Sequence, residues 1–314
     1  MGNYQSEPTV DHLNQLQNIY YIKLKMPNIS KYPCFKGFRR ISSDIKSNRK
    51  NKKIPYDKKT SYFLKLVSYT TEQERRCFNR EQKLLKLFQD YPEIIKPEKI
   101  VNISLSQKQY FIVASKFYQS KDLFEYLWHT VHIIDDDLIC NITFQCLKIL
   151  KILKTHQVLH NNIKFENFIV MTEYPLKLAL TGFKYSCKLD EREKSSSRCI
   201  TSLYKSPEVL QCRQHDFAAD MWSLGANIYL ALFNRYPYEI EQRDNETMIL
   251  DKIKKNELAN RNMLASNEAW RCISAMLEVN PNVRITPEEA LQLPWFDKLN
   301  KKPVKCIGQI IMDT

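Results

Sequence analysis

Glycine is scarce in this chain. Its 314 residues include five glycines, whereas ordinary usage would give about 22. Loops that bind phosphate groups through their backbone depend on glycine, because a residue without a Cβ atom lets the main chain approach the ligand closely. The scarcity therefore argues against any function that relies on a glycine-rich phosphate-binding loop.

Several other features are also missing. No apolar run reaches the length that would span a membrane, and no signal peptide opens the sequence. The nine cysteines are scattered, with no C-x-x-C pair and no cluster of cysteine and histidine. This pattern argues against a disulfide framework or a zinc site and is typical of a reducing compartment. We therefore expect a soluble intracellular protein.

The charge of the chain is strongly positive, with a formal net charge of +13. Such an excess fits a nucleic-acid or acidic-membrane partner, and it equally fits a solvated basic surface. Seven of the basic residues crowd into residues 46–59 among serine, asparagine and aspartate, which predicts an exposed loop. No arginine–aromatic alternation accompanies them, so a basic nucleic-acid-binding module is only an alternative, and nucleic acid is the less favoured partner.

The first six residues, MGNYQS, fit the pattern M-G-x-x-x-[ST] for N-myristoylation at Gly2. One myristoyl chain binds membranes only marginally, with an association constant of about 10⁴ M⁻¹, so a second signal is needed. The basic segment 46–59 can supply it, at about 1 kcal/mol per basic residue near an anionic surface. The hypothesis is a cytoplasmic protein that associates with anionic membranes through Gly2 and this loop.

The hydrophobic pattern predicts a sheet-rich part followed by a helical part, an α+β arrangement. Aromatic and branched residues predict strands over 19–24, 34–42, 61–69 and 107–117, with one amphipathic helix over 72–88. From about residue 121 the period becomes helical, with Leu138, Ile142, Cys146, Ile149 and Leu153 in one stripe. Further helices are expected near 219–233, 246–255, 267–277 and 287–293, the last with Thr286 as its N-cap.

Eight motifs follow one another in a recognisable order. They are SYFLKLV around Lys65, NREQKLLKL around Glu81, KDLFEYL (121–127), HNNIKFEN (160–167), LTG (180–182), KSPEVL (205–210), ADMWSLG (219–225) and NPNVRIT…LPWF (280–296). Together they resemble the eukaryotic protein kinases over residues 19–297, and the helical part is most similar to the calcium/calmodulin-dependent and calcium-dependent branch. The resemblance implies a bilobal fold, with a small sheet-rich N-lobe and a larger helical C-lobe.

The resemblance also implies domain boundaries. We expect a leader over residues 1–18, an N-lobe over 19–117 and a C-lobe over 121–297, with a C-terminal tail over 298–314. The basic segment becomes an inserted loop over 43–60.

Part of the kinase machinery is retained at the matching positions. The resemblance implies that Lys65 and Glu81 form an ion pair that positions phosphate groups, and that the backbone at Lys116 and Tyr118 could bind a purine. Lys164 and Asn167 match the loop lysine and the metal-binding asparagine. Four further matches have structural roles in such a fold. The resemblance implies that His160 packs in the core, that Asp220 anchors the backbone of the loop, and that Glu208 and Arg284 form an ion pair.

The losses fall on the chemistry of phosphoryl transfer. Asn162 stands at the position of the catalytic base, and an amide cannot accept the substrate's proton. Asn161 replaces an arginine that would meet a phosphorylated activation loop. Leu180 stands at the position of the metal-binding aspartate, although Mg²⁺ requires oxygen ligands, and residues 174–189 contain no carboxylate. Losing the base costs about 10²–10⁴ in rate, and losing the metal costs several kcal/mol more.

The leading hypothesis is therefore a pseudokinase that acts as a scaffold or allosteric regulator of an unknown protein partner, such as an active kinase or its substrate. The alternative is a weakly active Ser/Thr kinase that uses unconventional residues.

Nucleotide binding is left open by the residues. Residues 25–35 (KMPNISKYPCF) contain no glycine where the family has its phosphate-covering loop, and Phe63 stands where a small residue usually faces the adenine. Phe63 could fill the pocket or stack beside a displaced base. The retained lysines and Asn167 still favour phosphates, so ATP is the expected cofactor if there is one, and it would bind without Mg²⁺.

Overall fold

The computed structural model describes residues 20–25, 34–40, 56–105, 108–116, 121–190, 202–255, 258 and 265–301. The chain forms two compact units, the first of residues 1–80 and 95–119 and the second of residues 81–94 and 120–314. Gly2, residues 46–55 of the basic segment and Tyr118 lie outside the described residues. None of the helices within these ranges is long and apolar enough to cross a membrane.

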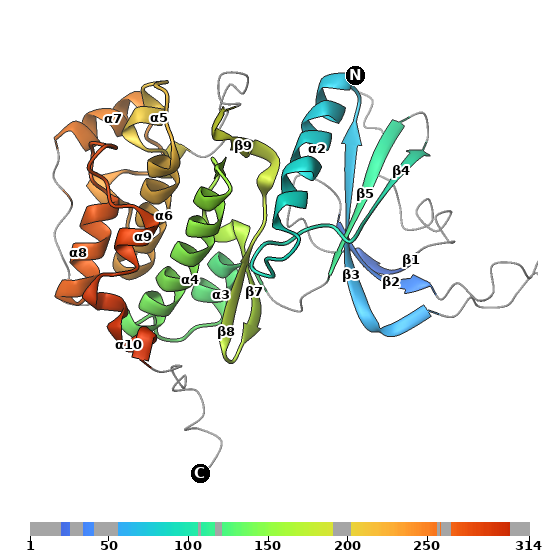
Figure 1. Ribbon diagram of the computed structural model, residues 1–314, viewed down its shortest axis with the longest axis horizontal. Helices are drawn as coiled ribbons and strands as arrows, with labels where there is room; N and C mark the ends of the chain where they lie inside the picture. Colours follow the sequence, from blue (N-terminus) through green and yellow to red (C-terminus); the bar gives the residue numbers. More distant parts are fainter. Residues whose placement is uncertain are drawn as a thin grey trace, which may run out of the picture. The chain divides into compact units, whose positions relative to one another are not determined.

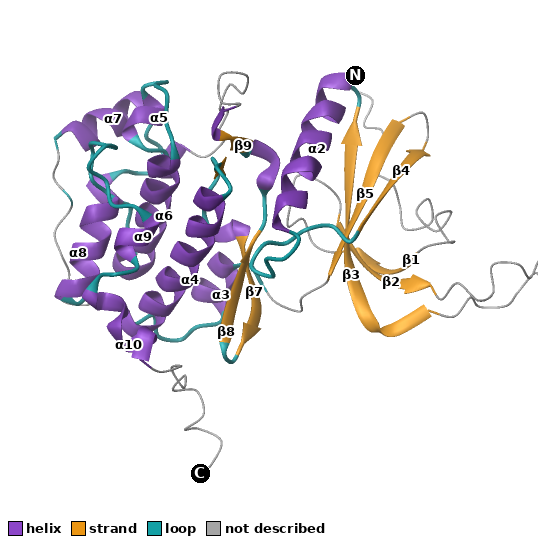
Figure 2. Cartoon of the chain, in the orientation of Figure 1, coloured by secondary structure: helices purple, strands orange, loops and turns teal. Residues whose placement is uncertain are grey.

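The first unit contains a five-stranded antiparallel sheet (Figure 2). Its strands are β1 (Tyr20–Lys25), β2 (Cys34–Arg40), β3 (Tyr56–Tyr69), β4 (Lys99–Leu105) and β5 (Lys108–Lys116), in the spatial order β1-β2-β3-β5-β4. Four of these strands were predicted from their aromatic and branched residues. Strand β4 (KIVNISL) was not predicted, although Val101, Ile103 and Leu105 alternate with asparagine and serine as in a strand.

The two faces of this sheet differ because successive side chains of a strand point to opposite sides. On one face, Tyr62, Leu64 and Leu66 of β3 are buried against Tyr110, Ile112 and Ala114 of β5. Phe63 and Lys65 belong to the other face and are half-buried. The alternation in SYFLKLV therefore sets which side chains build the core of this unit and which are presented on the opposite face.

One long strand corrects a sequence prediction. β3 begins at Tyr56, five residues before the strand expected at 61, so residues 56–60 of the expected basic loop are strand. This early part of β3 continues the pairing with β2, where Tyr56 lies opposite Arg40. Backbone pairing with β2, rather than an apolar pattern, makes residues 56–60 part of the strand.

Helix α2 (Glu72–Leu85) begins in the first unit and ends in the second. At its start the Glu74 carboxylate accepts hydrogen bonds from the main-chain N–H groups of Thr70 and Thr71, at 2.8 and 3.2 Å. These bonds hold the pKa of Glu74 below its ordinary value. Phe78, in the middle of the helix, stacks on Phe111 of β5 with ring centroids 4.1 Å apart. Phe78 thus packs this helix against the sheet, although it was not part of the predicted apolar face.

The second unit is mainly helical (Figure 1). Its helices are α3 (Leu123–His129), α4 (Asp136–Thr155), α5 (Pro207–Leu210), α6 (Phe217–Phe233), α7 (Glu246–Lys254), α8 (Asn267–Met276), α9 (Pro287–Ala290) and α10 (Asp297–Lys301). Two small antiparallel sheets accompany them, one of β6 (Val158–Leu159) with β9 (Cys187–Lys188), the other of β7 (Phe168–Glu173) with β8 (Leu176–Leu180). The helix expected over 287–293 ends at Ala290. The N–H groups of Gln292 and Leu293 instead donate to carbonyl oxygens three residues back, and Pro294 disfavours helical backbone only at Leu293.

Helices α4 and α6 lie side by side at the centre of this unit (Figure 1). Four residues of the predicted stripe on α4, namely Ile142, Cys146, Ile149 and Leu153, are fully buried, which confirms the helical period. On α6 the large side chains of Trp222 and Tyr229 are also enclosed. The core of the second unit therefore forms between two helices that the hydrophobic pattern of the sequence predicts.

One carboxylate connects three elements that are far apart in the sequence. Asp136, at the start of α4, accepts hydrogen bonds from the main-chain N–H and the hydroxyl of Ser266, at 3.1 and 3.2 Å. Its other oxygen accepts a hydrogen bond from the indole N–H of Trp295 at 3.0 Å. Ser266 is itself the N-cap of α8. Asp136 thus ties the beginning of α4 to the beginning of α8 and to the turn at Pro294–Phe296.

Candidate functional site

The loop His160–Asn167 runs between β6 and β7, and two side chains of α6 hold its backbone. Asp220, in the first turn of α6, accepts hydrogen bonds from the main-chain N–H groups of His160 and Asn161, at 2.7 and 3.0 Å. Two turns later on α6, Asn227 accepts a hydrogen bond from the N–H of Phe165 at 3.0 Å. Burial raises the pKa of Asp220 to about 7, although the two backbone hydrogen bonds oppose the shift. Both halves of the loop are therefore fixed by one rigid helix.

His160, the first residue of this loop, is fully buried. Its Nε2 lies 3.1 Å from the carbonyl oxygen of Thr181, and its ring meets the edge of Phe183 at a centroid distance of 4.9 Å. Burial lowers the pKa of His160 to about 4, so the imidazole is neutral at pH 7 and Nε2 donates the bond to Thr181. These contacts are those of a packing residue that connects the loop to residues 181–183.

Asn161 makes contacts that the sequence analysis did not foresee. Its backbone is left-handed, with φ of 63°, a conformation that asparagine tolerates better than most residues. Its amide donates a hydrogen bond to the carbonyl oxygen of Tyr185 at 3.1 Å, and its Oδ1 lies 3.0 Å from Nε2 of His215. The neutral amide of Asn161 therefore connects the loop to Tyr185 and His215. His215 was missed because nothing local in the sequence points to a partner so far away.

Asn167 connects the loop to the turn at Leu180–Gly182. Its side-chain amide donates a hydrogen bond to the main-chain carbonyl oxygen of Asn162 at 2.7 Å, and its main-chain carbonyl oxygen accepts one from the N–H of Thr181 at 2.8 Å. Gly182 has a φ of 88°, and a Cβ atom there would lie 2.7 Å from Asn167 Oδ1. The structure thus brings the three positions of the expected base, the metal-binding amide and the metal-binding turn next to one another.

Leu180 is the last residue of β8, and its side chain is 0% exposed. Its N–H donates a hydrogen bond to the carbonyl oxygen of Glu93 at 2.8 Å, and it forms a bridge with Ile94. Its side chain belongs to the main apolar cluster of the second unit. Instead of an oxygen ligand, the turn therefore presents an aliphatic side chain that is committed to the core.

Carboxylates close to the loop are few. Among the described residues, no group of three or more histidine, cysteine or acidic side chains is arranged to hold a metal ion. Glu166 is the acidic residue within the loop, and one of its oxygens accepts a hydrogen bond from Lys164 Nζ at 3.3 Å. Its other oxygen, Oε2, is buried without a hydrogen-bond partner. Glu166 was not singled out from the sequence, and the retained Lys164 is paired with it.

A buried ion pair supports the region below the loop. Arg284 donates hydrogen bonds to both carboxylate oxygens of Glu208, at 2.7 and 3.0 Å, and a third to the carbonyl oxygen of Ala218 at 2.7 Å. Its guanidinium also lies 5.0 Å from the ring centroid of Trp222. Burial raises the pKa of Glu208, but the bonds and charge of Arg284 outweigh it and hold the pKa below its ordinary value. The pair expected from the resemblance is present and fully formed.

The remaining predicted residues are divided between the units. Lys65 lies on β3 opposite Cys34 of β2 and Val113 of β5. Phe63 shares its face of the sheet, two residues earlier, and Lys116 ends β5. Glu81 lies on α2 in the part that belongs to the second unit. Phe63 and Lys65 are therefore presented together, as the alternation along the strand predicts.

Comparisons with known proteins identify the family. The protein kinase domain matches residues 51–296. An Aurora kinase of Debaryomyces hansenii is 29% identical over 191 residues, which cover 57% of this chain and 45% of that protein. The phosphorylase b kinase gamma catalytic chain, liver/testis isoform, of Rattus norvegicus is 25% identical over 237 residues, 72% of this chain and 56% of that one. The Arabidopsis thaliana serine/threonine-protein kinase AtPK1/AtPK6 is 27% identical over 226 residues, which cover 69% of this chain and 45% of that protein.

The chain spans about half the length of these relatives. Among solved structures, the crystal structure of the Rad53 kinase domain and SCD2 matches with a TM-score of 0.67 and 18% identity, covering 90% of this chain and 89% of that one. This likeness confirms the expected fold, with a sheet-containing N-lobe and a helical C-lobe. The domain match covers well over half of the sequence. The chain therefore belongs to the protein kinase domain family.

Proposed function

We propose that this chain is a pseudokinase, a protein kinase domain that transfers no phosphoryl group and acts as a scaffold or allosteric regulator of a protein partner. The observation that carries the proposal is the position of Leu180. Its side chain is fully buried in the apolar core at the place where the family holds a metal ion. Since Mg²⁺ is held by oxygen ligands, this turn supplies none of the coordination that phosphoryl transfer requires.

The catalytic base is the second missing part. The position of the base holds Asn162, whose side-chain amide cannot accept a proton at neutral pH. The main-chain carbonyl oxygen of Asn162 accepts a hydrogen bond from the side-chain amide of Asn167. General-base assistance is worth about 10²–10⁴ in rate, and kinases turn over at about 1–100 s⁻¹. Losing both the base and the metal leaves a rate far below that of a working enzyme.

The architecture around the missing chemistry is intact, and this favours a binding role. Asp220 and Asn227 anchor the loop, and Glu208 and Arg284 support the helices below it. Because the domain keeps these contacts but lacks a base and a metal ligand, it keeps an ordered surface that a protein partner can bind. We propose an unidentified protein as its partner, such as an active kinase or that kinase's substrate.

Nucleotide is proposed only as a ligand that binds without metal. Lys65 and Lys164 supply positive charge, and Asn167 supplies an amide near the turn at Gly182. None of these groups replaces the oxygen ligands that a metal ion needs, whereas Phe63 occupies the sheet face beside Lys65. We therefore expect any binding of ATP to be independent of Mg²⁺.

A weakly active Ser/Thr kinase is the second candidate. Two observations favour it: relatives of this chain are named as serine/threonine-protein kinases, and Oε2 of Glu166 is a carboxylate oxygen in the loop without a partner. For this candidate, Glu166 would have to take over the role of the base or of a metal ligand.

Membrane association through N-myristoylation of Gly2 and the basic segment 46–59 is a separate part of the proposal, argued from the sequence. Metabolic labelling with an alkyne analogue of myristate tests it, and a Gly2→Ala chain serves as the unlabelled control. Incorporation that is equal in the two proteins would contradict it.

The decisive experiment measures phosphate transfer from radiolabelled ATP to a general basic substrate, with the wild-type chain and its Lys65→Ala variant side by side. We expect no incorporation in the wild type above the level of the variant. Incorporation that Lys65→Ala abolishes would establish the weakly active kinase instead. Thermal unfolding with ATP, in Mg²⁺ and in EDTA, tests the nucleotide, because a ligand of the folded state raises stability by RT ln(1 + [L]/Kd).

A further inference from the structure

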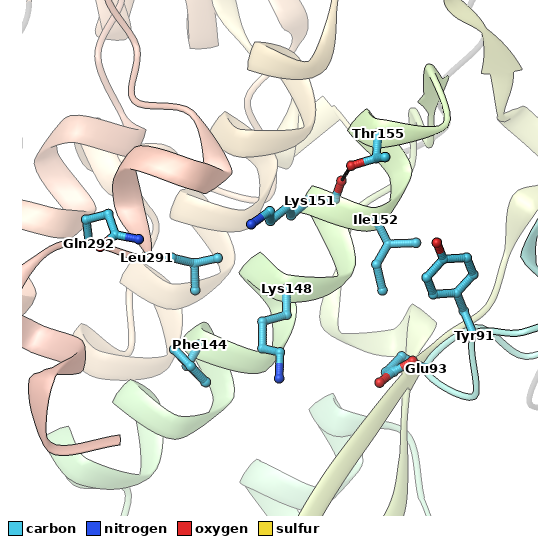
Figure 3. Close-up of a pocket in the computed structure, with 9 residues that line it drawn as sticks. All are labelled: Tyr91, Glu93, Phe144, Lys148, Lys151, Ile152, Thr155, Leu291 and Gln292. Carbon is cyan, nitrogen blue, oxygen red and sulfur yellow. Dashed lines mark hydrogen bonds between the residues drawn. The ribbon is translucent and has the colours of Figure 1, made fainter. Parts of the chain in front are cut away.

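The outer face of α4 forms the base of a surface groove in the second unit (Figure 3). The groove has a volume of about 520 Å³ and lies between the end of α9 and the segment at residues 91–93. None of its lining residues belongs to the loop at 160–167 or to the turn at 180–182. It is thus separate from the candidate site described above.

Apolar side chains form the base and the walls of the groove. Phe144 and Ile152 lie eight residues apart on α4, so they share one helical face. Leu291 faces them from the end of α9, and Tyr91 from the other side (Figure 3). All four are half-buried and pack against the main core. A preformed apolar surface of this volume is within the range of ordinary ligand sites, about 300–1,000 Å³.

Two lysines give the groove its charge. Lys148 and Lys151 are exposed and line it, while Glu93 is its single lining carboxylate. Within the described part of the chain neither lysine has an ion pair, and Lys148 Nζ lies 5.5 Å from the ring centroid of Phe144. Lys154, one helical turn further on, is instead paired with Glu288 at 2.7 Å. The groove therefore combines an apolar base with two lysines and one carboxylate, a net positive lining.

We propose that this groove, called here the α4 groove, binds an acidic and apolar peptide segment of a partner protein. The α4 groove extends along α4 from Phe144 to Thr155, a rise of about 16 Å, which matches about five residues of extended chain. Apolar side chains of that segment lie over Phe144 and Ile152, and its carboxylates meet Lys148 and Lys151. This inference names a partner class for the scaffold role and rests on that role.

The test uses the full-length protein and fluorescence anisotropy. The probe is a fluorescein-labelled pentapeptide, Asp-Leu-Glu-Ile-Phe, and the matched control peptide is Lys-Leu-Lys-Ile-Phe. We expect saturable binding of the acidic peptide, weakened by added salt, and no binding of the control. The double substitution Lys148→Glu with Lys151→Glu should weaken binding at least about tenfold, because two attractive contacts become repulsive.

A matched protein variant checks that the effect is local. Lys177→Glu makes one of the same charge reversals at an exposed lysine of β8, outside the α4 groove, and should leave affinity within about twofold. Leu291→Asp should abolish binding by placing a charge on the apolar wall. Circular dichroism of every variant establishes that it is folded before its affinity is compared.

Several results would overturn the inference. They are no binding of the acidic peptide up to about 1 mM, equal binding of the two peptides, or equal weakening by Lys177→Glu. Self-association that the double variant abolishes would make a second copy of this chain the occupant. Tighter peptide binding after removal of residues 302–314 would assign the α4 groove to the chain's own C-terminal segment.

Failure of the pseudokinase proposal remains distinguishable from these results. It would appear as phosphate transfer that depends on Lys65, with peptide binding at the α4 groove unchanged.

Discussion

Gly182 lies so close to the side-chain amide of Asn167 that a Cβ atom on Gly182 would sit 2.7 Å from Asn167 Oδ1. Its φ of 88° adds a second restriction, since this backbone conformation is strained for residues with a Cβ atom. One of only five glycines in the chain therefore lies where a residue with a Cβ atom would strain the backbone and displace the Asn167 side chain. The position is constrained by conformation and contact, even though the neighbouring metal-binding carboxylate is absent.

Replacing this glycine tests the constraint. We expect Gly182→Ala to lower the free energy of unfolding by about 1–3 kcal/mol, through backbone strain and the contact with Asn167. Urea unfolding followed by circular dichroism measures the change. Glu173→Ala, an exposed substitution at the end of β7, is the control and should stay within about 0.5 kcal/mol. A neutral Gly182→Ala would mean that the turn relaxes freely.

The stability of the fold should depend on the protonation of His160. Its pKa is about 4 in the folded chain and near the ordinary value of about 6.5 when unfolded. The unfolded chain therefore takes up the proton first, so this contribution is complete above about pH 6.5 and is lost as the pH falls towards 4. The difference corresponds to roughly 3 kcal/mol.

Urea unfolding of the wild type and of His160→Gln, at about pH 7 and about pH 5, isolates this contribution. The variant should be less stable at neutral pH but should lose less on acidification. Asp220 has its pKa raised to about 7, which acts in the opposite direction, but it is present in both proteins and cancels in the comparison. Parallel pH profiles for the two proteins would contradict the prediction.

Restoring the family's two carboxylates should not restore activity. Leu180→Asp replaces a fully buried side chain with a carboxylate in an apolar cluster, and we expect it to cost more than about 3 kcal/mol. Asn162→Asp, at a half-buried position, should fold. Thermal unfolding and phosphate transfer by the double variant check both statements, with the exposed Lys177→Asp in the same strand as the control. A stable double variant that gains activity would show that only two side chains separate this chain from an enzyme.

The buried ion pair of Glu208 and Arg284 should contribute far more than an exposed one. Arg284→Met leaves the buried Glu208 carboxylate without its partner and should cost about 3–5 kcal/mol. Arg243 makes a short ion pair with Glu241 at the surface, at 2.6 Å, and Arg243→Met should change stability by less than about 1 kcal/mol. Denaturant unfolding of the two variants compares them directly, and equal losses would refute the argument.

The parts of the fold that the sequence predicts are those in which one periodic pattern decides the structure. The stripe on α4 and the alternation on β3 mark buried faces, so the helix and the strand could be placed from residue order alone. β4 was overlooked, although Val101, Ile103 and Leu105 alternate with polar residues at the period of a strand. The early start of β3 has no such pattern, since its strand character comes from hydrogen bonds with the partner strand β2.

The candidate site divides in the same way. Motif positions identified Asn162, Leu180 and the pair of Glu208 with Arg284, because those residues lie at fixed places along the chain. Burial of Leu180 and the bond between Asn161 and His215 could not be read, since both depend on which distant segments fold next to the loop. Asparagine at 161 carried a weak signal, as it is among the residues that tolerate left-handed backbone.

The bonds of Asp136 have a consequence for synthesis of the chain on the ribosome. Its carboxylate binds the indole of Trp295, which lies 159 residues later in the sequence, and Ser266, which lies 130 residues later. Both partners are therefore synthesised long after Asp136. A nascent chain that has emerged only as far as α6 possesses both central helices but lacks the groups that fasten the start of α4. At a synthesis rate of about 5–20 residues per second, that interval lasts several seconds, during which Asp136 lacks these partners and α6 lacks its packing against α8.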